Sequence, residues 1–226
     1  MTLRQFFITA ASVAALASSA IAQDFTGDMT AYTLRSPMAG NCNYMTAGAG
    51  ASVNYAALNA PQFDSTKSCG RCALISCTDT RCKDKTKTQL VYLLDQCLEC
   101  KSGDLDVAPS VFKTLTGSDP ARYKIKWKFV NCPVKGSLQY CLMVGSNPYW
   151  IAVQPANSAV GIKSMTINGK PTTMVPSAYY YLLQSPTPVN LSSIQISVTS
   201  IGGQTVNETV SLTTNKCTPG TKQFTA

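Results

Sequence analysis

The sequence predicts an all-β protein in which two β-rich domains follow one another. Strand-like alternation is clearest at residues 123–130, where lysines alternate with apolar residues. The two halves differ in composition: residues 42–132 hold eight of the ten cysteines, and the remainder is rich in Ser, Thr and Val. We therefore place the domains at residues 23–136 and 137–226.

Short strands separated by turn signals predict a β-sandwich for the second domain. Residues 193–200 and 205–212 flank a Gly-Gly turn and predict a hairpin, and Asn168-Gly169 predicts a second turn. Long helical periodicity is absent from the mature chain, where we expect only short helices at 55–59 and 110–115. This pattern is typical of a sandwich of short strands.

The first 22 residues have the pattern of a secretory signal. Arg4 supplies the positive charge, residues 6–20 are apolar or small, and Ala20-Ile21-Ala22 fits the small-x-small cleavage rule. The apolar run is too short to span a bilayer, so we expect cleavage and secretion rather than a membrane anchor.

The amino-acid composition excludes several kinds of site. The chain has no histidine, which removes Ser-His-Asp and Cys-His nucleophiles and histidine metal sites. Its 11 Asp and Glu residues are the main remaining acid and base candidates. The 10 cysteines of a secreted chain predict five disulfides, although Cys69–Cys72 and Cys97–Cys100 also have zinc-like spacing. We expect neither a metal nor a cofactor.

The chain is basic, with a formal net charge of +8 before the signal is removed. Only 13% of its residues are charged, and no run of Lys and Arg reaches five. Basic secreted proteins often meet polyanions. An acidic wall polysaccharide is therefore a better candidate partner than nucleic acid, and a solvated basic surface remains the simpler interpretation.

Two aspartates frame a loop that contains a Cys-x-x-Cys motif. Asp95 follows the predicted strand at 92–94, and Asp106 precedes the predicted helix at 110–115. An acid near a helix start usually caps the helix. The alternative is a carboxyl group at the mouth of a cleft that acts on a sugar, and the loop alone leaves both interpretations open.

Seven segments along the chain carry motifs of one known family in the same order: Gly40–Tyr44, Tyr55–Asn59, Cys69–Cys72, Leu94–Cys97, Gly103–Val107, Ile125–Pro133 and Asn147–Gln154. With these motifs the chain resembles expansins and expansin-like proteins over essentially its whole mature length. Barwin-like proteins share the Asp-Gln-Cys and Leu-Asp pieces, so the ordered set, followed by a Tyr-Trp domain, carries the resemblance.

The resemblance implies a fold and a function. The fold is a six-stranded double-psi β-barrel followed by an immunoglobulin-like carbohydrate-binding module. The function is the loosening of cell walls without measurable hydrolysis. Cellulose is the implied partner, with xyloglucan and acidic pectin as further candidates, and we expect a secreted monomer in the cell wall.

The resemblance also implies site residues in the barrel. Asp106 matches the essential aspartate of the family, Asp95 matches its companion, and Thr33 matches a threonine on the first barrel strand. Inverting endoglucanases that share this barrel take their acid from the position of Asp106 and their base from the first strand, where this chain has no acid. Glycoside hydrolysis usually needs two carboxyls across the bond. An endo-β-1,4-glucanase and a barwin-like binding-only protein remain the alternatives.

Aromatic residues of the second domain are the candidates for sugar stacking. Tyr149, Trp150 and Tyr179 match the aromatic triplet of the family's binding face, with Tyr181 as the alternative to Tyr179. Strand alternation places residues 179 and 181 on one face and Tyr180 on the other. An isolated Tyr-Trp pair is otherwise more typical of a sandwich core.

Spacing and the family pattern together suggest a disulfide scheme. The suggested bridges are Cys42–Cys69, Cys72–Cys132, Cys77–Cys82, Cys97–Cys100 and Cys141–Cys217.

Both sequons, at Asn190 and Asn207, lie in the second domain and are candidate glycosylation sites.

Overall fold

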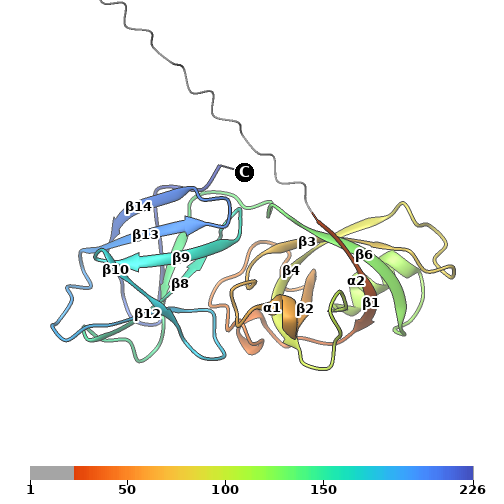
Figure 1. Ribbon diagram of the computed structural model, residues 1–226, viewed down its shortest axis with the longest axis horizontal. Coiled ribbons are helices and arrows are strands. Elements are labelled where there is room, and N and C mark those ends of the chain that lie inside the picture. Colours follow the sequence, from red (N-terminus) through yellow and green to blue (C-terminus); the bar gives the residue numbers. More distant parts are fainter. Residues whose placement is uncertain (1–22, 226) are drawn as a thin grey trace, which may run out of the picture.

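The computed structural model describes residues 23–225, so the predicted signal at residues 1–22 lies outside the described part of the chain. A closed barrel and a pair of sheets lie side by side along the long axis of the molecule (Figure 1). The protein is all-β, as the sequence predicts. Its helices are short and belong to the first half of the chain.

Six strands close the barrel in the order β1-β5-β2-β4-β3-β6. β1 pairs in parallel with β5 and antiparallel with β6, so the first strand joins the two ends of the ring. Met29, Leu93, Leu105 and Trp127 are fully or almost fully buried. The strands are β1 (Asp24–Ala31), β2 (Tyr55–Asn59), β3 (Cys72–Cys77), β4 (Thr88–Cys97), β5 (Leu105–Val107) and β6 (Tyr123–Val130).

The helix predicted at residues 55–59 is wrong, because this segment is strand β2. Every residue of β2 is buried, between β4 on one side and β5 on the other. A short continuous apolar run does not distinguish a buried strand from a buried helix by periodicity. The helix, α1 (Ala60–Phe63), begins immediately afterwards, where the Asn59 side chain accepts a hydrogen bond from Gln62 N.

The second predicted helix is confirmed as α2 (Pro109–Thr116). Pro109 occupies the first turn, where its missing N–H costs nothing, and Gly117 ends the helix in the left-handed conformation, with φ 70°. The short 3-10 turn η1 (Pro37–Ala39) lies between β1 and β2.

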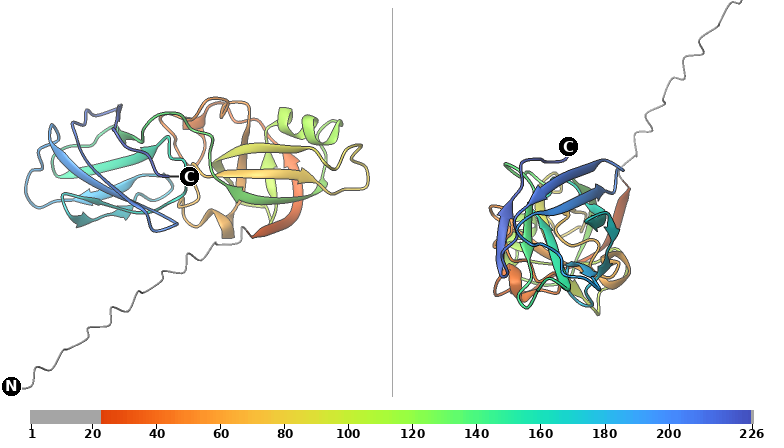
Figure 2. Two further views of the ribbon diagram at one scale, coloured as in Figure 1. Left: turned by 90° about the horizontal axis from the view of Figure 1, so that it is seen from above. Right: turned by 90° about the vertical axis from the view of Figure 1, so that its left-hand side faces the viewer.

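The second half of the chain forms a four-stranded and a five-stranded sheet (Figure 2). The predicted hairpin is confirmed as β13 (Ile194–Ser200) and β14 (Thr205–Val210), and Asn168-Gly169 turns the chain from β9 (Ile162–Ile167) into β10 (Lys170–Pro171). These four strands form one sheet. The other contains β11 (Thr173–Met174), β12 (Tyr181–Gln184), β8 (Trp150–Ala156), β7 (Gln139–Leu142) and β15 (Lys216–Pro219).

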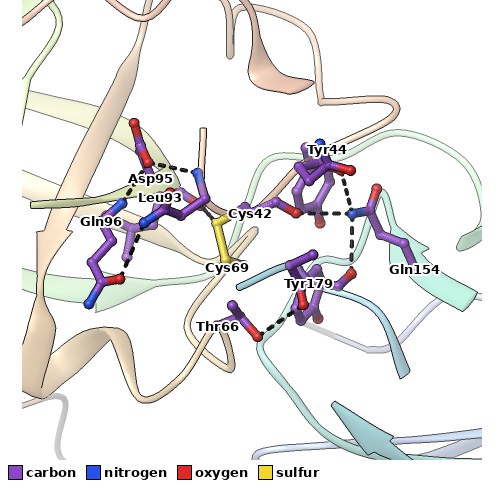
Figure 3. The surroundings of a disulfide bond; sticks show 12 residues. Cys42, Tyr44, Thr66, Cys69, Leu93, Asp95, Gln96, Gln154 and Tyr179 are labelled. Carbon is purple, nitrogen blue, oxygen red and sulfur yellow. Dashed lines mark hydrogen bonds between the residues drawn. A yellow bond between two sulfur atoms is a disulfide. The ribbon is translucent and has the colours of Figure 1, made fainter. Parts of the chain in front are cut away.

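One buried glutamine joins the barrel to the five-stranded sheet (Figure 3). Gln154, on β8, donates from Nε2 to the carbonyl oxygens of Cys42, Asn43 and Tyr179 at 3.3, 3.1 and 3.2 Å. Its Oε1 accepts from Met45 N at 2.9 Å. Because Gln154 has no exposed surface, these bonds fix the barrel loop at 42–45 against the sheet without competition from water.

All five suggested disulfides are present in the structure. Four of them belong to the barrel half of the chain. The fifth, Cys141–Cys217, joins β7 to β15 across directly paired positions. No described cysteine is free.

Candidate functional site

Asp106 lies on β5 directly opposite Thr30 of β1, on the outer surface of the barrel. The neighbouring residues Leu105 and Val107 are fully buried, so alternation turns the Asp106 side chain outward. Thr30 Oγ1 donates a hydrogen bond to Asp106 Oδ1 at 2.9 Å. The capping interpretation is wrong, because the residue at the cap position of α2 is Ala108.

Thr30, and not Thr33, is the threonine that contacts the aspartate. β1 ends at Ala31, and Thr33 is exposed beyond the end of the strand. The parallel register Thr30↔Asp106 brings these two side chains together. The segment contains two threonines three residues apart, and the strand end that decides between them is set by pairing with β5, which the sequence does not reveal.

Asp95 accepts three hydrogen bonds that organise the neighbouring loop. Its Oδ1 accepts from the backbone N–H groups of Asn41 and Gln96 at 2.7 and 2.9 Å. Its Oδ2 accepts from the Tyr32 hydroxyl at 3.3 Å. Asp95 therefore holds the loop and the Tyr32 phenol in place beside the Asp106 surface.

The surroundings of Asp106 favour its protonated form. Burial raises the pKa of its carboxyl above the usual value, and the charges of Glu99 and Asp95 add to the rise. The hydrogen bond from Thr30 and the charge of Arg122 act in the opposite direction without cancelling it. Glu99, in the loop between Cys97 and Cys100, is thus an acid that the motif comparison missed.

Tyr32 belongs to the same group. Burial raises the pKa of its phenol far above the ordinary range, and the Asp95 charge contributes in the same direction. The hydroxyl therefore stays protonated at any physiological pH. It acts as a fixed hydrogen-bond donor in the site.

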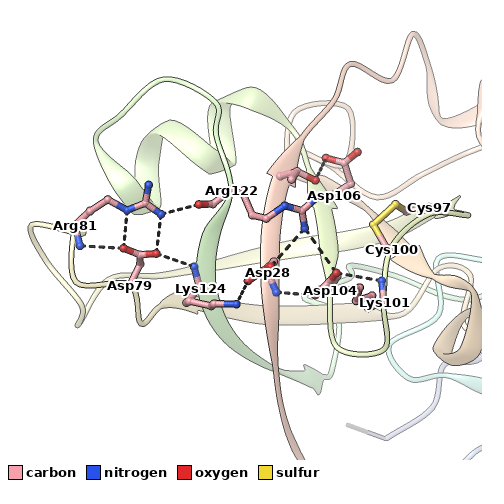
Figure 4. Close-up of polar contacts among 11 residues, drawn as sticks. Asp28, Asp79, Arg81, Cys97, Cys100, Lys101, Asp104, Asp106, Arg122 and Lys124 are labelled. Atoms are coloured by element: carbon pink, nitrogen blue, oxygen red, sulfur yellow. Dashed lines mark hydrogen bonds and ion pairs between the residues drawn. A yellow bond between two sulfur atoms is a disulfide. The ribbon is translucent and has the colours of Figure 1, made fainter.

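Asp28, the acid nearest to the first-strand position in sequence, is engaged elsewhere (Figure 4). It forms ion pairs with Lys124 and with Arg122, the latter at 3.5 Å. The Lys124 ammonium, helped by Arg122, lowers the pKa of the Asp28 carboxyl. Asp28 therefore stays ionised within this charged cluster.

Tyr149 and Trp150 project from an irregular turn that precedes the regular part of β8. Asn147 Oδ1 accepts from the backbone N–H groups of both residues, at 3.0 and 3.2 Å. Tyr149 is 53% exposed. Trp150 is partly buried against a small cluster that contains Ala152 and Tyr180. Both rings thus belong to the outer side of the five-stranded sheet.

The expected exposure of Tyr179 and Tyr181 is wrong. Tyr179 is 1% exposed and stacks on Tyr44 of the barrel with ring centroids 5.8 Å apart. Tyr181 is 4% exposed, and its hydroxyl donates to the Ile162 carbonyl inside the pair of sheets. Tyr180, which alternation places on the other side, is also only 1% exposed and its hydroxyl donates to the Asn43 carbonyl of the barrel. All three rings are therefore buried, against the barrel or between the two sheets.

Both sequons are accessible for modification. Asn190 and Asn207 are exposed.

Within residues 23–225, no group of three or more Cys, Asp or Glu side chains has the arrangement of a metal site. Over the same range, no helix has the length and apolar character needed to cross a membrane.

The sequence is similar to proteins named as expansins. It is 28% identical over 122 residues to Expansin-YoaJ of Bacillus subtilis, and 27% identical over 180 residues to Expansin-like protein 5 of Dictyostelium discoideum. The matches cover 53% and 76% of this chain. The chain spans about half of the Bacillus protein, 52%, and 73% of the Dictyostelium protein. No protein-family model matches the chain.

The fold has a close counterpart among solved structures. The apo expansin of Clavibacter michiganensis superposes with a TM-score of 0.76 and 21% identity, over 90% of this chain and 99% of that one. The chain therefore has an expansin fold. Together with the sequence relatives, this match supports the expansin family for the protein.

Proposed function

We propose that this protein is a secreted expansin-like protein that binds cellulose-rich cell wall and loosens it without hydrolysis. In this proposal residues 23–136 form a double-psi barrel domain, and residues 137–226 form an immunoglobulin-like carbohydrate-binding domain. A point mutant of the Clavibacter expansin, with the same fold and 20% identity, is described in complex with cellohexaose. That complex and the named relatives support a β-1,4-glucan as the ligand.

The observation that carries the proposal is the pairing of Asp106 with a threonine. Across the strand pair, Asp106 meets Thr30 rather than a second carboxyl. An inverting glycosidase places its base far enough from the acid to activate a water, commonly about 6.5–9.5 Å. On β1 the nearest acid, Asp28, is held in ion pairs with Lys124 and Arg122.

A single carboxyl with a raised pKa can still act on a glucan. In its protonated form, Asp106 donates a hydrogen bond to a sugar hydroxyl, and in its ionised form it accepts one. The Tyr32 hydroxyl donates its one proton to Asp95, so toward a sugar hydroxyl its oxygen acts as an acceptor. We propose that these groups replace hydrogen bonds between neighbouring glucan chains, which loosens the wall and leaves glycosidic bonds intact.

Glu99 and Asp95 favour one alternative, an endo-β-1,4-glucanase. Both acids lie close enough to Asp106 to raise its pKa. Either one could serve as a base if it faced the bound glucan. The assay that separates the two functions is therefore chemical rather than structural.

We expect the purified protein to weaken cellulose filter paper while releasing no more reducing sugar than a blank. The measurement is tensile strength together with reducing-end release, on the same paper and on soluble glucan. Steady release of reducing ends with protein concentration would contradict the proposal and establish the glucanase.

Tyr149→Ala should weaken binding to cellulose several-fold with an unchanged melting temperature. The ring is more than half exposed, so its removal opens no cavity in the core. Trp150→Ala is a poorer test, since part of that ring packs against Ala152 and Tyr180 and its loss also affects stability. Depletion from solution by microcrystalline cellulose gives the affinity. Unchanged depletion would remove Tyr149 from the binding surface.

A further inference from the structure

The outer face of the four-stranded sheet carries two neighbouring rows of uncharged polar side chains. Figure 1 shows β9, β13 and β14 side by side in this sheet. The buried residues Met165, Val198 and Val206 face inward, so alternation turns their neighbours along each strand outward. The strand register sets these neighbours in two rows, Ser164, Thr199 and Thr205 in one and Thr166, Ser197 and Asn207 in the next.

A shallow depression of about 400 Å³ lies on this face, over the second row. Thr166, Ser197, Asn207 and Thr209 are among the residues that line it. Within residues 23–225, no hydrogen bond engages the side chains of these four residues. In the first row, by contrast, the hydroxyls of Thr199 and Thr205 lie 3.0 Å apart and bond to each other. The depression therefore offers hydroxyl and amide groups that are free to bind a ligand.

The charged groups beside the depression are engaged elsewhere. Glu208 also lines it, but this carboxylate points to the inner side of β14, where Oε1 accepts from the backbone N–H groups of Thr221 and Lys222 at 3.0 and 2.6 Å. Lys222 Nζ donates to the Asn207 carbonyl oxygen at 2.8 Å. A ligand in the depression thus meets hydroxyl and amide groups rather than a free charge, which suits a neutral sugar.

Asn207 is also the acceptor residue of a sequon, Asn207-Glu208-Thr209. Because the Asn207 side chain lies in the lining, a sugar attached to its amide nitrogen begins inside the depression. β14 is the edge strand of its sheet, and a bulky hydrophilic group there also hinders pairing with another chain.

The second sequon has different surroundings. Asn190 lies in the loop between β12 and β13, outside the lining of the depression. Its Oδ1 accepts from the backbone N–H and the hydroxyl of Ser192 at 3.1 and 2.6 Å. A sugar on Asn190 therefore starts from a local turn in a loop rather than from a row of polar side chains.

We propose that Asn207 carries an N-linked glycan whose first sugars occupy this depression and cover the outer face of the four-stranded sheet. In the transfer, Asn207 Nδ2 forms a bond to the anomeric carbon of an oligosaccharide carried on a lipid pyrophosphate. The bond from that carbon to the pyrophosphate oxygen breaks, the amide gives up one proton to a base of the transferring enzyme, and nothing is oxidised or reduced. Of the proposed function, the inference uses only secretion, since Tyr149 and Trp150 belong to the other sheet.

The test uses the protein secreted by a yeast that attaches N-glycans, with glycopeptide mass spectrometry at both sequons. An endoglycosidase releases the glycans from native and from denatured protein, and each native rate is divided by the denatured rate. This ratio should be about tenfold lower at Asn207 than at Asn190, because each hydrogen bond to the depression reduces the released, accessible population by about fivefold.

Thr166→Ala combined with Ser197→Ala removes two hydroxyls from the depression and keeps the sequon. This double variant should raise the ratio at Asn207 to near that at Asn190. Ser164→Ala, on the same face but outside the lining, is the matched control and should leave the ratio at Asn207 unchanged. If Asn190 carries no glycan, the comparison of wild type with the double variant decides.

The melting temperature gives a second measurement. Asn207→Gln should lower it by about 2–4 °C, as expected for the loss of one favourable contact in a chain of this size, whereas Asn190→Gln should leave it unchanged. The effect of Asn207→Gln should vanish when both proteins are produced without glycans in a bacterial periplasm. That control separates the glycan from the substitution itself.

Three results would overturn the inference. Secreted protein without a glycan at Asn207 would do so and leave the proposed glucan binding standing. Equal ratios at the two sequons would show that the Asn207 glycan projects into solvent. A low ratio at Asn207 that persists in the folded double variant would show that the strand, and not the depression, protects the sugar. Depletion by cellulose, measured on the same proteins, tests the proposed function separately.

Discussion

Asp106→Asn is expected to abolish the weakening of cellulose while leaving cellulose binding nearly intact. Asparagine keeps the shape of the side chain, and its carbonyl oxygen can still accept the hydrogen bond from Thr30 Oγ1. What it loses is the ability to exchange a proton and to carry charge. The measurement pairs the tensile assay with the depletion assay on the same preparation.

The pH dependence of stability supplies the control for this variant. Because the folded-state pKa of Asp106 is raised, the folded protein holds this proton more tightly than the unfolded chain does. Its contribution is therefore fully favourable below the unfolded pKa and is lost as the pH rises through the folded pKa. Asp106→Asn should be at least as stable as wild type at pH 7, and its advantage should shrink as the pH falls.

Two results would contradict the role of Asp106. Full weakening activity in Asp106→Asn would show that the carboxyl is not needed, as expected for a binding-only protein. Loss of activity together with a large fall in melting temperature at pH 7 would make Asp106 a structural residue. Thr30→Val removes only the hydroxyl donor. Its activity and melting temperature then show whether the loss comes from the Thr30–Asp106 hydrogen bond or from the carboxyl group itself.

The strand pattern could be predicted because it leaves local marks in the sequence, whereas the disulfide pairing followed from cysteine spacing together with the resemblance to expansins. Alternating lysines define β6, and the Gly-Gly turn defines the β13–β14 hairpin. Strand β2 left no such mark. It is covered on all sides, so its residues are continuously apolar up to Asn59, and that pattern also fits a buried helix.

The candidate site was predictable only in part, since it depends on pairing between distant segments. Asp106 and Asp95 can be picked out by their sequence motifs, but the residues that hydrogen-bond to them lie far away in the sequence. Thr30 reaches Asp106 through the β1–β5 register, and Tyr32 reaches Asp95 across 63 positions. The burial of Tyr179 and Tyr181 depends on distant contacts in the same way. Alternation predicts that residues 179 and 181 share a face, but contacts with Tyr44 of the barrel and with Ile162 of the other sheet bury both rings, and the sequence does not reveal these contacts.

Gln154→Leu is expected to lower the free energy of unfolding by about 3 kcal/mol, because buried groups that lose their partners each cost roughly 1–3 kcal/mol. The change leaves the Met45 N–H without its acceptor, and the carbonyls of Cys42, Asn43 and Tyr179 without this donor. Leucine is similar in volume, so the loss reports the hydrogen bonds rather than a cavity. Chemical denaturation followed by fluorescence gives the value.

The same variant tests whether the two halves must be aligned. Gln154 lies on the same strand as Trp150 and holds the loop that leads from Asn41, the residue that donates to Asp95. If a glucan must touch both halves at once, loss of the Gln154 hydrogen bonds should reduce wall weakening more than it reduces binding to cellulose. Gln195→Leu, at an exposed position of β13 in the four-stranded sheet, is the matched control and should change neither. If Gln154→Leu still weakens the wall despite its lower stability, the barrel and the sheets act independently. Their covalent linkage then only keeps each part at a high local concentration near the site of the other.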